Sequence, residues 1–408
     1  MSSGPSPRST SRLPVSTSGT TLVYLDFLVT GIVMTFLGPM LPVLSARWSL
    51  TDEQAGYLLF AQFFSSMFGM LSSGPLVQRI GYRLTLIIGL LMMASGMALL
   101  ASGPWLLGIV AVCVLGIGHG ITTPAGNLRT AEVNPHGSAS ALNLINAVWG
   151  IGAVSSPFLV AIAQRAHRIP LFFYGTSAAL LILLLAFFLA RFEPDTRTRA
   201  RHSSAPGHSV WNHRLLPVIC VLFFVYVGTE TSFGGWLTSY AHRVGTGQHS
   251  FWAMPTSFFW GALLAGRVLA PLALKFHRET AIARIGLTLA LAGGLAIASA
   301  HGMGLLIPGA ALAGLGLASI FPISVSLFPR WFGESTTSSS SPVFASGNIG
   351  GAVLPWLVGV VSTHTGSLRS GFLVPLLGVA AMLTFYVAHD ISREQARNLH
   401  SEDSVPKA

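Results

Sequence analysis

Charged residues are scarce in this chain. Only 9% of its 408 residues are Asp, Glu, Lys or Arg, whereas 51% are hydrophobic. In a soluble globular domain about a quarter of the residues are charged. The composition therefore excludes an ordinary soluble protein and indicates an integral membrane protein.

Cysteines and catalytic motifs are also scarce. Cys113 and Cys220 both lie in apolar runs, which predicts two small buried thiols and no disulfide. The sequence has no Gly-rich phosphate loop followed by Lys, and the serines of "GESTTSSSSP" (Gly333 to Pro342) have no neighbouring base. We therefore expect no enzyme activity, no ATP-driven transport, no metal site and no cofactor apart from a coupling ion.

What the chain does have is a series of apolar segments of about 20 residues, each long enough to cross a bilayer. They predict an all-α membrane protein with twelve transmembrane helices. The polar ends, residues 1–19 and 390–408, have the composition of disordered tails. The predicted spans are 20–44, 54–75, 82–101, 104–127, 139–163, 169–190, 214–240, 251–274, 281–300, 303–328, 341–363 and 370–389.

The placement of Lys and Arg predicts the orientation. With both termini in the cytoplasm, most of the 23 basic residues lie inside. The exceptions are Arg47, Arg165, Arg168, Arg243 and Arg369. The positive-inside rule favours this arrangement. The net charge of +10 is then a topology signal, so we expect a multi-pass protein of the cell (inner) membrane that binds no nucleic acid.

The chain also divides into two similar halves. A polar linker, 191–213, separates predicted six-helix bundles at 20–190 and 214–389. "IGAVSSPFLV" in span five aligns without gaps to "IGGAVLPWLV" in span eleven, and "GMLSSG" in span two parallels "GALLAG" in span eight. Transporters built from such repeats bind substrate between the halves, near the bilayer midplane. Because two halves already form a closed pathway, we expect a monomer.

One loop motif suggests a family. "GPLVQRIGYR", which follows span two, resembles the signature G-x-L-x-D-R-x-G-x-R of the major facilitator superfamily. The resemblance implies gating roles for Arg79 and Arg83 at the cytoplasmic face. The sequence departs from the signature at Gln78, where the family has an Asp that helps to latch the two bundles.

Other stretches resemble the fucose permease branch of that superfamily, which includes sodium-dependent glucose transporters. They are "GNLR" and "LNLINAVWGIGA" in spans four and five, and "YVGTETSFGGWLTSY", "FWGALLAGR" and "GNIGGAVLPWLVG" in spans seven, eight and eleven. The resemblance implies sugar transport and places Asn143 where that permease contacts its sugar. The permease's functional carboxylates correspond here to Gly38 and Thr123, so its proton-coupling pair is missing.

Glu230 is the single acid in the run from Leu215 to Ala241. An acid at the centre of a span costs roughly 2.5–3.5 kcal/mol on insertion scales. We therefore expect Glu230 to face a hydrated cavity between the halves, on the same helix face as Tyr226. There it would accept sugar hydroxyls, bind a proton, or do both. The alternative is a structural hydrogen bond to a neighbouring helix.

Asp26, His119 and Arg267 are further ionisable residues within predicted spans. Asp26 either reaches interfacial water or is buried and accepts the coupling ion. His119 could relay a proton or donate to a sugar, but a neutral histidine bonded between helices is the favoured interpretation. Arg267 is expected to extend to the cytoplasmic interface as a gate.

Sugars are bound by amides, which donate to and accept from hydroxyls, and by aromatic planes, which cover C–H faces. The alternatives are hydrogen bonds between helices for the amides and an interfacial belt for the tryptophans, Trp236 above all. The predicted substrate-binding residues are Gln62, Asn127, Asn143, Asn146, Trp149, Tyr226, Glu230, Trp260 and Asn348.

The favoured hypothesis is a secondary transporter that moves a hexose such as glucose by alternating access. Coupling to H⁺ would use Asp26, Glu230 or His119, and Na⁺ is the main rival ion. Uniport, proton-driven efflux of amphiphilic compounds, and a receptor or scaffold on a transporter fold remain open.

Overall fold

The computed structural model describes residues 17–134, 137–190, 216–245, 252–326 and 336–402, and within these ranges the chain is helical. The helices are α1 (Thr17–Thr35), α2 (Leu37–Trp48), α3 (Asp52–Ser102), α4 (Trp105–Val133), α5 (Ser138–Arg165), α6 (Ile169–Leu189), α7 (Leu216–Val244), α8 (Met254–Ala273), α9 (Glu279–Ser299), α10 (Met303–Leu317), α11 (Ile320–Ser326), α13 (Thr336–Thr365), α14 (Leu368–Gly371) and α15 (Leu373–Glu402).

Within the described ranges, ten stretches of helix are long and apolar enough to cross a membrane, or eleven if the bent pair α1 and α2 counts as one span. The all-helical class is therefore confirmed, with long apolar helices close to the predicted spans. Several of the connections predicted from the sequence, the linker 191–213 among them, lie outside the described residues, and the division into two bundles stays a prediction.

Two breaks in the helices have identifiable causes. Between α1 and α2 the axis bends by 42°. Pro39 has no N–H to offer the carbonyl of Thr35, four residues earlier, so the helix cannot continue straight. Within α3, Gly81 adopts φ 79° and ψ 166°, a conformation open in practice only to glycine. Gly81 belongs to the loop motif between the predicted spans two and three.

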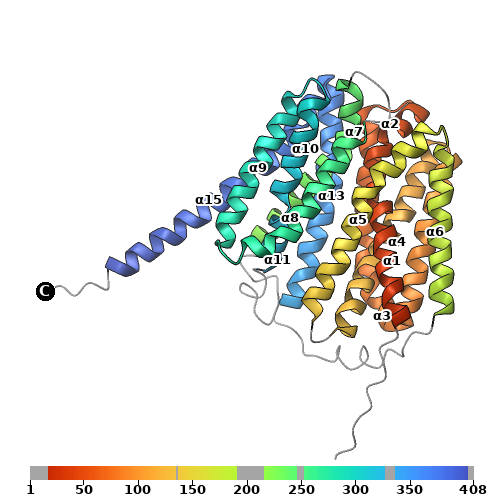
Figure 1. Ribbon diagram of the computed structural model, residues 1–408, viewed down its shortest axis with the longest axis horizontal. Helices are drawn as coiled ribbons and strands as arrows, with labels where there is room; N and C mark the ends of the chain where they lie inside the picture. The colour runs from red at the N-terminus through yellow and green to blue at the C-terminus, as the bar shows by residue number, and fades with distance from the viewer. Residues whose placement is uncertain (1–16, 135–136, 191–215, 246–251, 327–335, 403–408) are drawn as a thin grey trace, which may run out of the picture.

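The helices before residue 190 lie on one side of the molecule and those after residue 216 on the other, as the red-to-yellow and green-to-blue colours show (Figure 1). The two sets meet where α3 packs on α13, α5 on α8, and α2 on α7. Backbones approach closely there: a Cβ on Gly38 would collide with the carbonyl oxygen of Gly234. Small residues permit such contacts between membrane helices.

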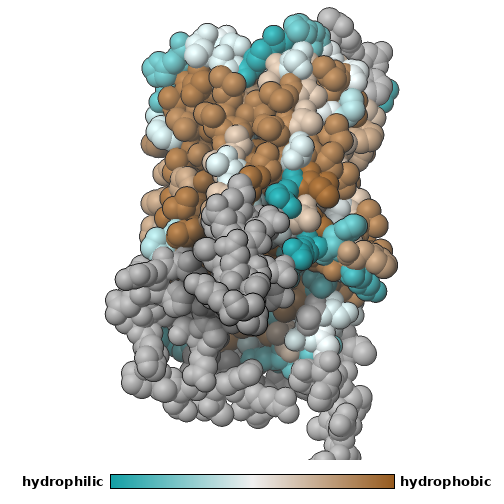
Figure 2. Space-filling view, turned by 90° about the vertical axis from the view of Figure 1, so that its left-hand side faces the viewer, coloured by the Kyte–Doolittle hydropathy of each residue, from teal (hydrophilic) through white to brown (hydrophobic). Residues whose placement is uncertain are grey.

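The outer surface is largely apolar. Figure 2 shows hydrophobic residues over much of one face, with hydrophilic residues along its upper end and in smaller groups to the right of centre. Large side chains such as those of Leu106, Ile182 and Leu189 are more than two-thirds exposed. Such a surface suits contact with lipid and would be unusual in contact with water.

The structure differs from the sequence prediction at the C-terminal end. A disordered tail was expected from residue 390, but α15 continues as a helix to Glu402 and projects from the bundle (Figure 1). The physical reason is local. The segment "DISREQARNLHSE" is rich in helix-forming Arg, Glu, Gln, Ala and Leu, and it contains neither Gly nor Pro.

Candidate functional site

Glu230 lies in the middle of α7 and is 8% exposed. The hydroxyl of Tyr226, one turn earlier, donates to Glu230 Oε2. From α8, Nη2 of Arg267 reaches Oε1 at 3.3 Å, Oε2 at 3.2 Å and the hydroxyl of Tyr226 at 3.2 Å. The i, i+4 spacing in α7 thus places a phenol beside the carboxylate, and α8 brings a cation to both.

This arrangement balances the charge of Glu230. A buried carboxylate is tolerated when a cation and hydrogen bonds replace its water. Arg267 was expected to extend to the cytoplasmic interface, but its guanidinium turns towards Glu230. It also lies 5.8 Å from the centroid of the Phe321 ring. Its gating role stays a prediction. The Nε of Arg267 is buried and has no hydrogen-bond partner among the described residues, so it is a candidate donor for a ligand.

Asp26 in α1 has a different environment. Its side chain is fully buried, at 0% exposure. Oδ1 accepts a hydrogen bond from the Thr30 hydroxyl at 3.1 Å, and Oδ2 has no partner among the described residues. Of the two interpretations of this acid, the structure supports the buried one. A carboxylate held there would lack a neutralising cation in the part of the chain that the structure describes.

His119 belongs to α4 and contacts α3 through Ser66. Its Nδ1 is 3.2 Å from the hydroxyl of Ser66, and its Nε2 is 3.2 Å from the hydroxyl of Thr123. Both ring nitrogens are occupied, so the geometry fits the interpretation of a neutral histidine bonded between helices.

Two tryptophans meet between the halves. Trp149 of α5 and Trp260 of α8 pack edge to face, with ring centroids 6.1 Å apart and planes at 81°. Trp260 also lies on α7, because a Cβ on Gly234 would collide with its ring. Its Nε1 is buried, and no acceptor for it lies in the part of the chain that the structure describes. The pair offers an aromatic surface and a free donor one turn along α7 from Glu230.

The predicted amides divide between buried and exposed positions. Gln62 is buried and donates from Nε2 to the carbonyl of Met34 at 3.1 Å, whereas its Oε1 has no partner within the described ranges. The Oδ1 of Asn127 is likewise buried and unpartnered. These two acceptors are available to a bound solute.

The remaining amides lie differently. Asn143 and Asn146 are exposed, and Asn146 donates to the carbonyl of Leu142 in its own helix at 2.7 Å. Asn348 donates to Met70 Sδ across the halves at 3.1 Å and to the carbonyl of Phe344 at 3.0 Å. None of the hydrogen bonds of Glu230 described above comes from Asn143 or Asn146 of span five. Binding roles for these amides stay predictions.

The loop-motif arginines flank the Gly81 turn. Arg83 donates to the carbonyl of Phe187 at 2.9 Å and lies 5.5 Å from the ring of Phe188, both at the end of α6. Arg79 is exposed. These contacts of Arg83 lie within the first half, and the predicted gating roles of both residues remain untested.

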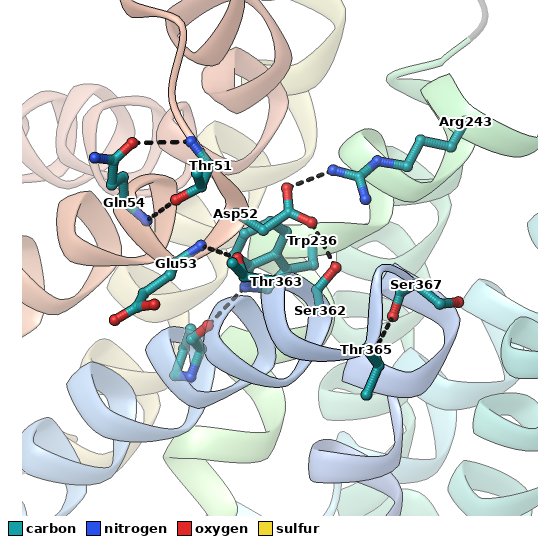
Figure 3. A network of polar contacts seen from close by, with 11 residues as sticks. Thr51, Asp52, Glu53, Gln54, Trp236, Arg243, Ser362, Thr363, Thr365 and Ser367 are labelled. Atoms are coloured by element: carbon teal, nitrogen blue, oxygen red, sulfur yellow. Dashed lines mark hydrogen bonds and ion pairs between the residues drawn. The ribbon is translucent and has the colours of Figure 1, made fainter.

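The sequence analysis did not predict a polar cluster around Asp52, which we call the Asp52 cluster. It lies at the end of the bundle opposite the Gly81 turn, and we call that end the Asp52 end. Asp52, at the start of α3, forms an ion pair with Arg243 at the end of α7 and accepts from the hydroxyl of Ser362 in α13 (Figure 3). The available signal was a pair of opposite charges at two span ends predicted to share one side of the membrane.

Trp236 corrects another expectation. It was assigned to an interfacial belt, but it is buried at 1% exposure and donates from Nε1 to the carbonyl of Pro355 at 2.8 Å. The donor joins α7 to α13 beneath the Asp52 cluster.

The comparisons with known proteins agree with this fold. Residues 24–255 match the family described as Major Facilitator Superfamily. The chain belongs to the Major Facilitator Superfamily. The resemblance noted in the loop motif is thereby confirmed, and this member of the superfamily is a multi-pass integral membrane protein.

Several of its relatives carry sugar names. It is 26% identical over 393 residues to a glucose/galactose transporter of Brucella abortus biovar 1 (strain 9-941), covering 90% of this chain and 92% of the relative. It is 24% identical over 351 residues to the glucose/mannose transporter GlcP of Bacillus subtilis (strain 168), covering 82% and 86%. The crystal structure of the E. coli fucose:proton symporter FucP aligns with a TM-score of 0.61 at 20% identity, covering 90% and 97%, which shows a shared fold.

Proposed function

We propose that this protein is a proton-coupled hexose transporter of the cell membrane that works by alternating access as a monomer. Its two acids carry the proposal. Asp26 is buried with no cation beside it among the residues that the structure describes, and Glu230 is buried against Arg267. Sugar specificity is inferred from the relatives named as glucose transporters, and the proposal includes no enzyme activity and no cofactor beyond the coupling ion.

Twelve spans follow from simple dimensions. At 1.5 Å per residue, the 51 residues of α3 would extend roughly 77 Å, more than twice the apolar thickness of a bilayer. The break at Gly81 divides α3 into two spans, and the bent pair α1 and α2 makes one. An even number of spans puts both termini on one side, and the Lys and Arg bias puts that side in the cytoplasm.

Asp26 is proposed as the proton site. A carboxylate buried without a cation is far less stable than the neutral acid, so binding a proton favours the conformation described. When the protein opens and Asp26 meets water, the proton can leave. Proton binding is then linked to the conformational equilibrium, which is the requirement for coupling.

Glu230 and Arg267 are proposed to bind the sugar. The carboxylate accepts from hydroxyls, and the free Nε of Arg267 donates to a ring or hydroxyl oxygen. Trp149 and Trp260 supply the apolar plane. Gln62 adds an acceptor from the first half. Groups from both halves would thus close on one solute.

The test is uptake of labelled hexoses into proteoliposomes, with and without an inward proton gradient. The proposal expects saturable uptake of at least one hexose, accumulated above equilibrium only when the gradient is present. Saturable uptake in which the internal sugar concentration never exceeds the external one would reject symport and support uniport. Lack of saturable uptake of any hexose would reject the sugar assignment.

A further inference from the structure

The Asp52 end of the bundle is closed by contacts between the two halves. Asp52 belongs to the first half, whereas its partners Arg243 and Ser362 belong to the second (Figure 3). Next to it, the backbone N–H of Glu53 donates to the hydroxyl of Thr363 at 2.9 Å. A Cβ on Gly359 would collide with the carbonyl oxygen of Asp52, so α13 lies directly against the start of α3.

The local sequence "TDEQ" holds Asp52 in position. Thr51 accepts from the N–H of Gln54 at 3.2 Å, and Gln54 Oε1 accepts from the N–H of Thr51 at 3.0 Å. This capping box starts the helix and fixes its first turn. The carboxylate of Asp52 is 15% exposed, so it keeps only limited contact with water.

An aromatic layer lies beneath this polar cluster. Trp356 of α13 stacks on Tyr57 of α3, with centroids 6.3 Å apart, and meets Phe60 at 6.2 Å. A Cβ on Gly56 would contact the backbone of Trp356. These aromatic contacts help to close this end of the bundle. They are packing contacts and depend less on direction than the ion pair of Asp52 with Arg243.

We propose that Asp52, Arg243 and Ser362 form a latch that holds the extracellular end closed, and that release of Asp52 from the second half is the step that opens the site to external sugar. The proposal rests on the alternating-access function above. Asp52 acts as a positioning residue, because it touches the opposite half and lies apart from the proposed sugar-binding groups. Its single carboxylate engages two helices at once, so one substitution breaks both contacts.

The test measures the opening directly, without sugar. Spin labels are placed at Ala166, in the α5–α6 connection, and at His301, in the α9–α10 connection, both exposed. Cys113 and Cys220, which are free thiols, are replaced by alanine in every variant. Asp52→Asn is expected to raise the population with the longer distance about two- to ten-fold, the range for one partly exposed charged contact.

Glu53→Gln is the matched control. It removes the neighbouring acid, whose carboxylate accepts from Tyr57 within the same half at 3.1 Å and whose contact with Thr363 uses only the backbone. The control should leave the distances unchanged. If Asp52→Asn folds poorly, Arg243→Gln breaks the ion pair from the other side and should produce a shift in the same direction.

Identical distance distributions for Asp52→Asn, Arg243→Gln, Glu53→Gln and the parent protein would overturn the latch. The two substitutions should not be additive in free energy, because they remove the same contact. A double variant Asp52→Asn/Arg243→Gln whose free-energy shift equals the sum of the two single shifts would therefore also reject the latch. Since no sugar is present, either result stands whether or not hexose uptake is found.

Discussion

Each half of this protein buries an acid, and the two acids differ in whether a cation lies beside them. In the second half, Glu230 is bound by Tyr226 and paired with Arg267. In the first, Asp26 accepts one hydrogen bond from Thr30 and leaves Oδ2 unpartnered. The difference teaches that burial by itself does not define the role of an acid. In the proposed function the paired acid binds solute, whereas the unpaired acid exchanges a proton.

The largest effect is expected from Asp26→Asn. The amide fills the same space but cannot release a proton, so accumulation driven by a proton gradient should be abolished while exchange of sugar at equilibrium continues. Uphill uptake and counterflow in proteoliposomes measure the two processes separately. Thr30→Val, which removes the hydrogen bond but keeps the acid, is the control and should retain accumulation. Normal accumulation by Asp26→Asn would move the proton site elsewhere.

Glu230→Gln should weaken sugar binding and spare coupling. Hydrogen bonds to a charged group contribute about 1.5–3 kcal/mol, so the apparent affinity should fall roughly 10- to 100-fold. The accumulation ratio at saturating sugar should stay close to that of the parent protein. Concentration-dependent uptake with a fixed gradient gives both values. Loss of accumulation with unchanged affinity would reverse the roles of the two acids.

A smaller effect is expected from Arg267→Met, which leaves the carboxylate of Glu230 with Tyr226 alone. The side chain of Arg267 is 27% exposed, so water offsets part of the loss, and we expect stability to fall by about 1–3 kcal/mol. Thermal unfolding in detergent measures the change. Adding Glu230→Gln removes the unpaired charge and should restore part of the melting temperature. A double variant no more stable than Arg267→Met would argue against the ion pair.

Much of the architecture was predictable because it depends on local pattern. Apolar runs near 20 residues predict spans, and "GPLVQRIGYR" predicts a turn that Gly81 then makes at positive φ. The i, i+4 spacing of Tyr226 and Glu230 predicts their contact within one helix. Each of these features needs only one stretch of chain, and helical geometry does the rest.

Contacts between helices were not predictable in the same way. Arg267 was expected at the interface and pairs with Glu230 instead, 37 positions away in the chain. Asp52 and Arg243, 191 positions apart, received no joint role. Trp236 was assigned to a belt and is buried on Pro355. In each case the partner depends on how two packed helices are rotated and shifted relative to each other. The hydropathy pattern of the sequence gives neither quantity.

The sequence alone determined that this chain crosses membranes many times, that its charges favour cytoplasmic termini, and that acids lie at depths where they require a function or a partner. Those properties follow from the length of the apolar segments and from the positions of the charged residues. Both can be read directly from consecutive residues of the chain. Tertiary structure alone decided which acid is neutralised and which residues close the Asp52 end. Ion pairs and hydrogen bonds act over a few ångströms, so only packing of distant segments can assign them.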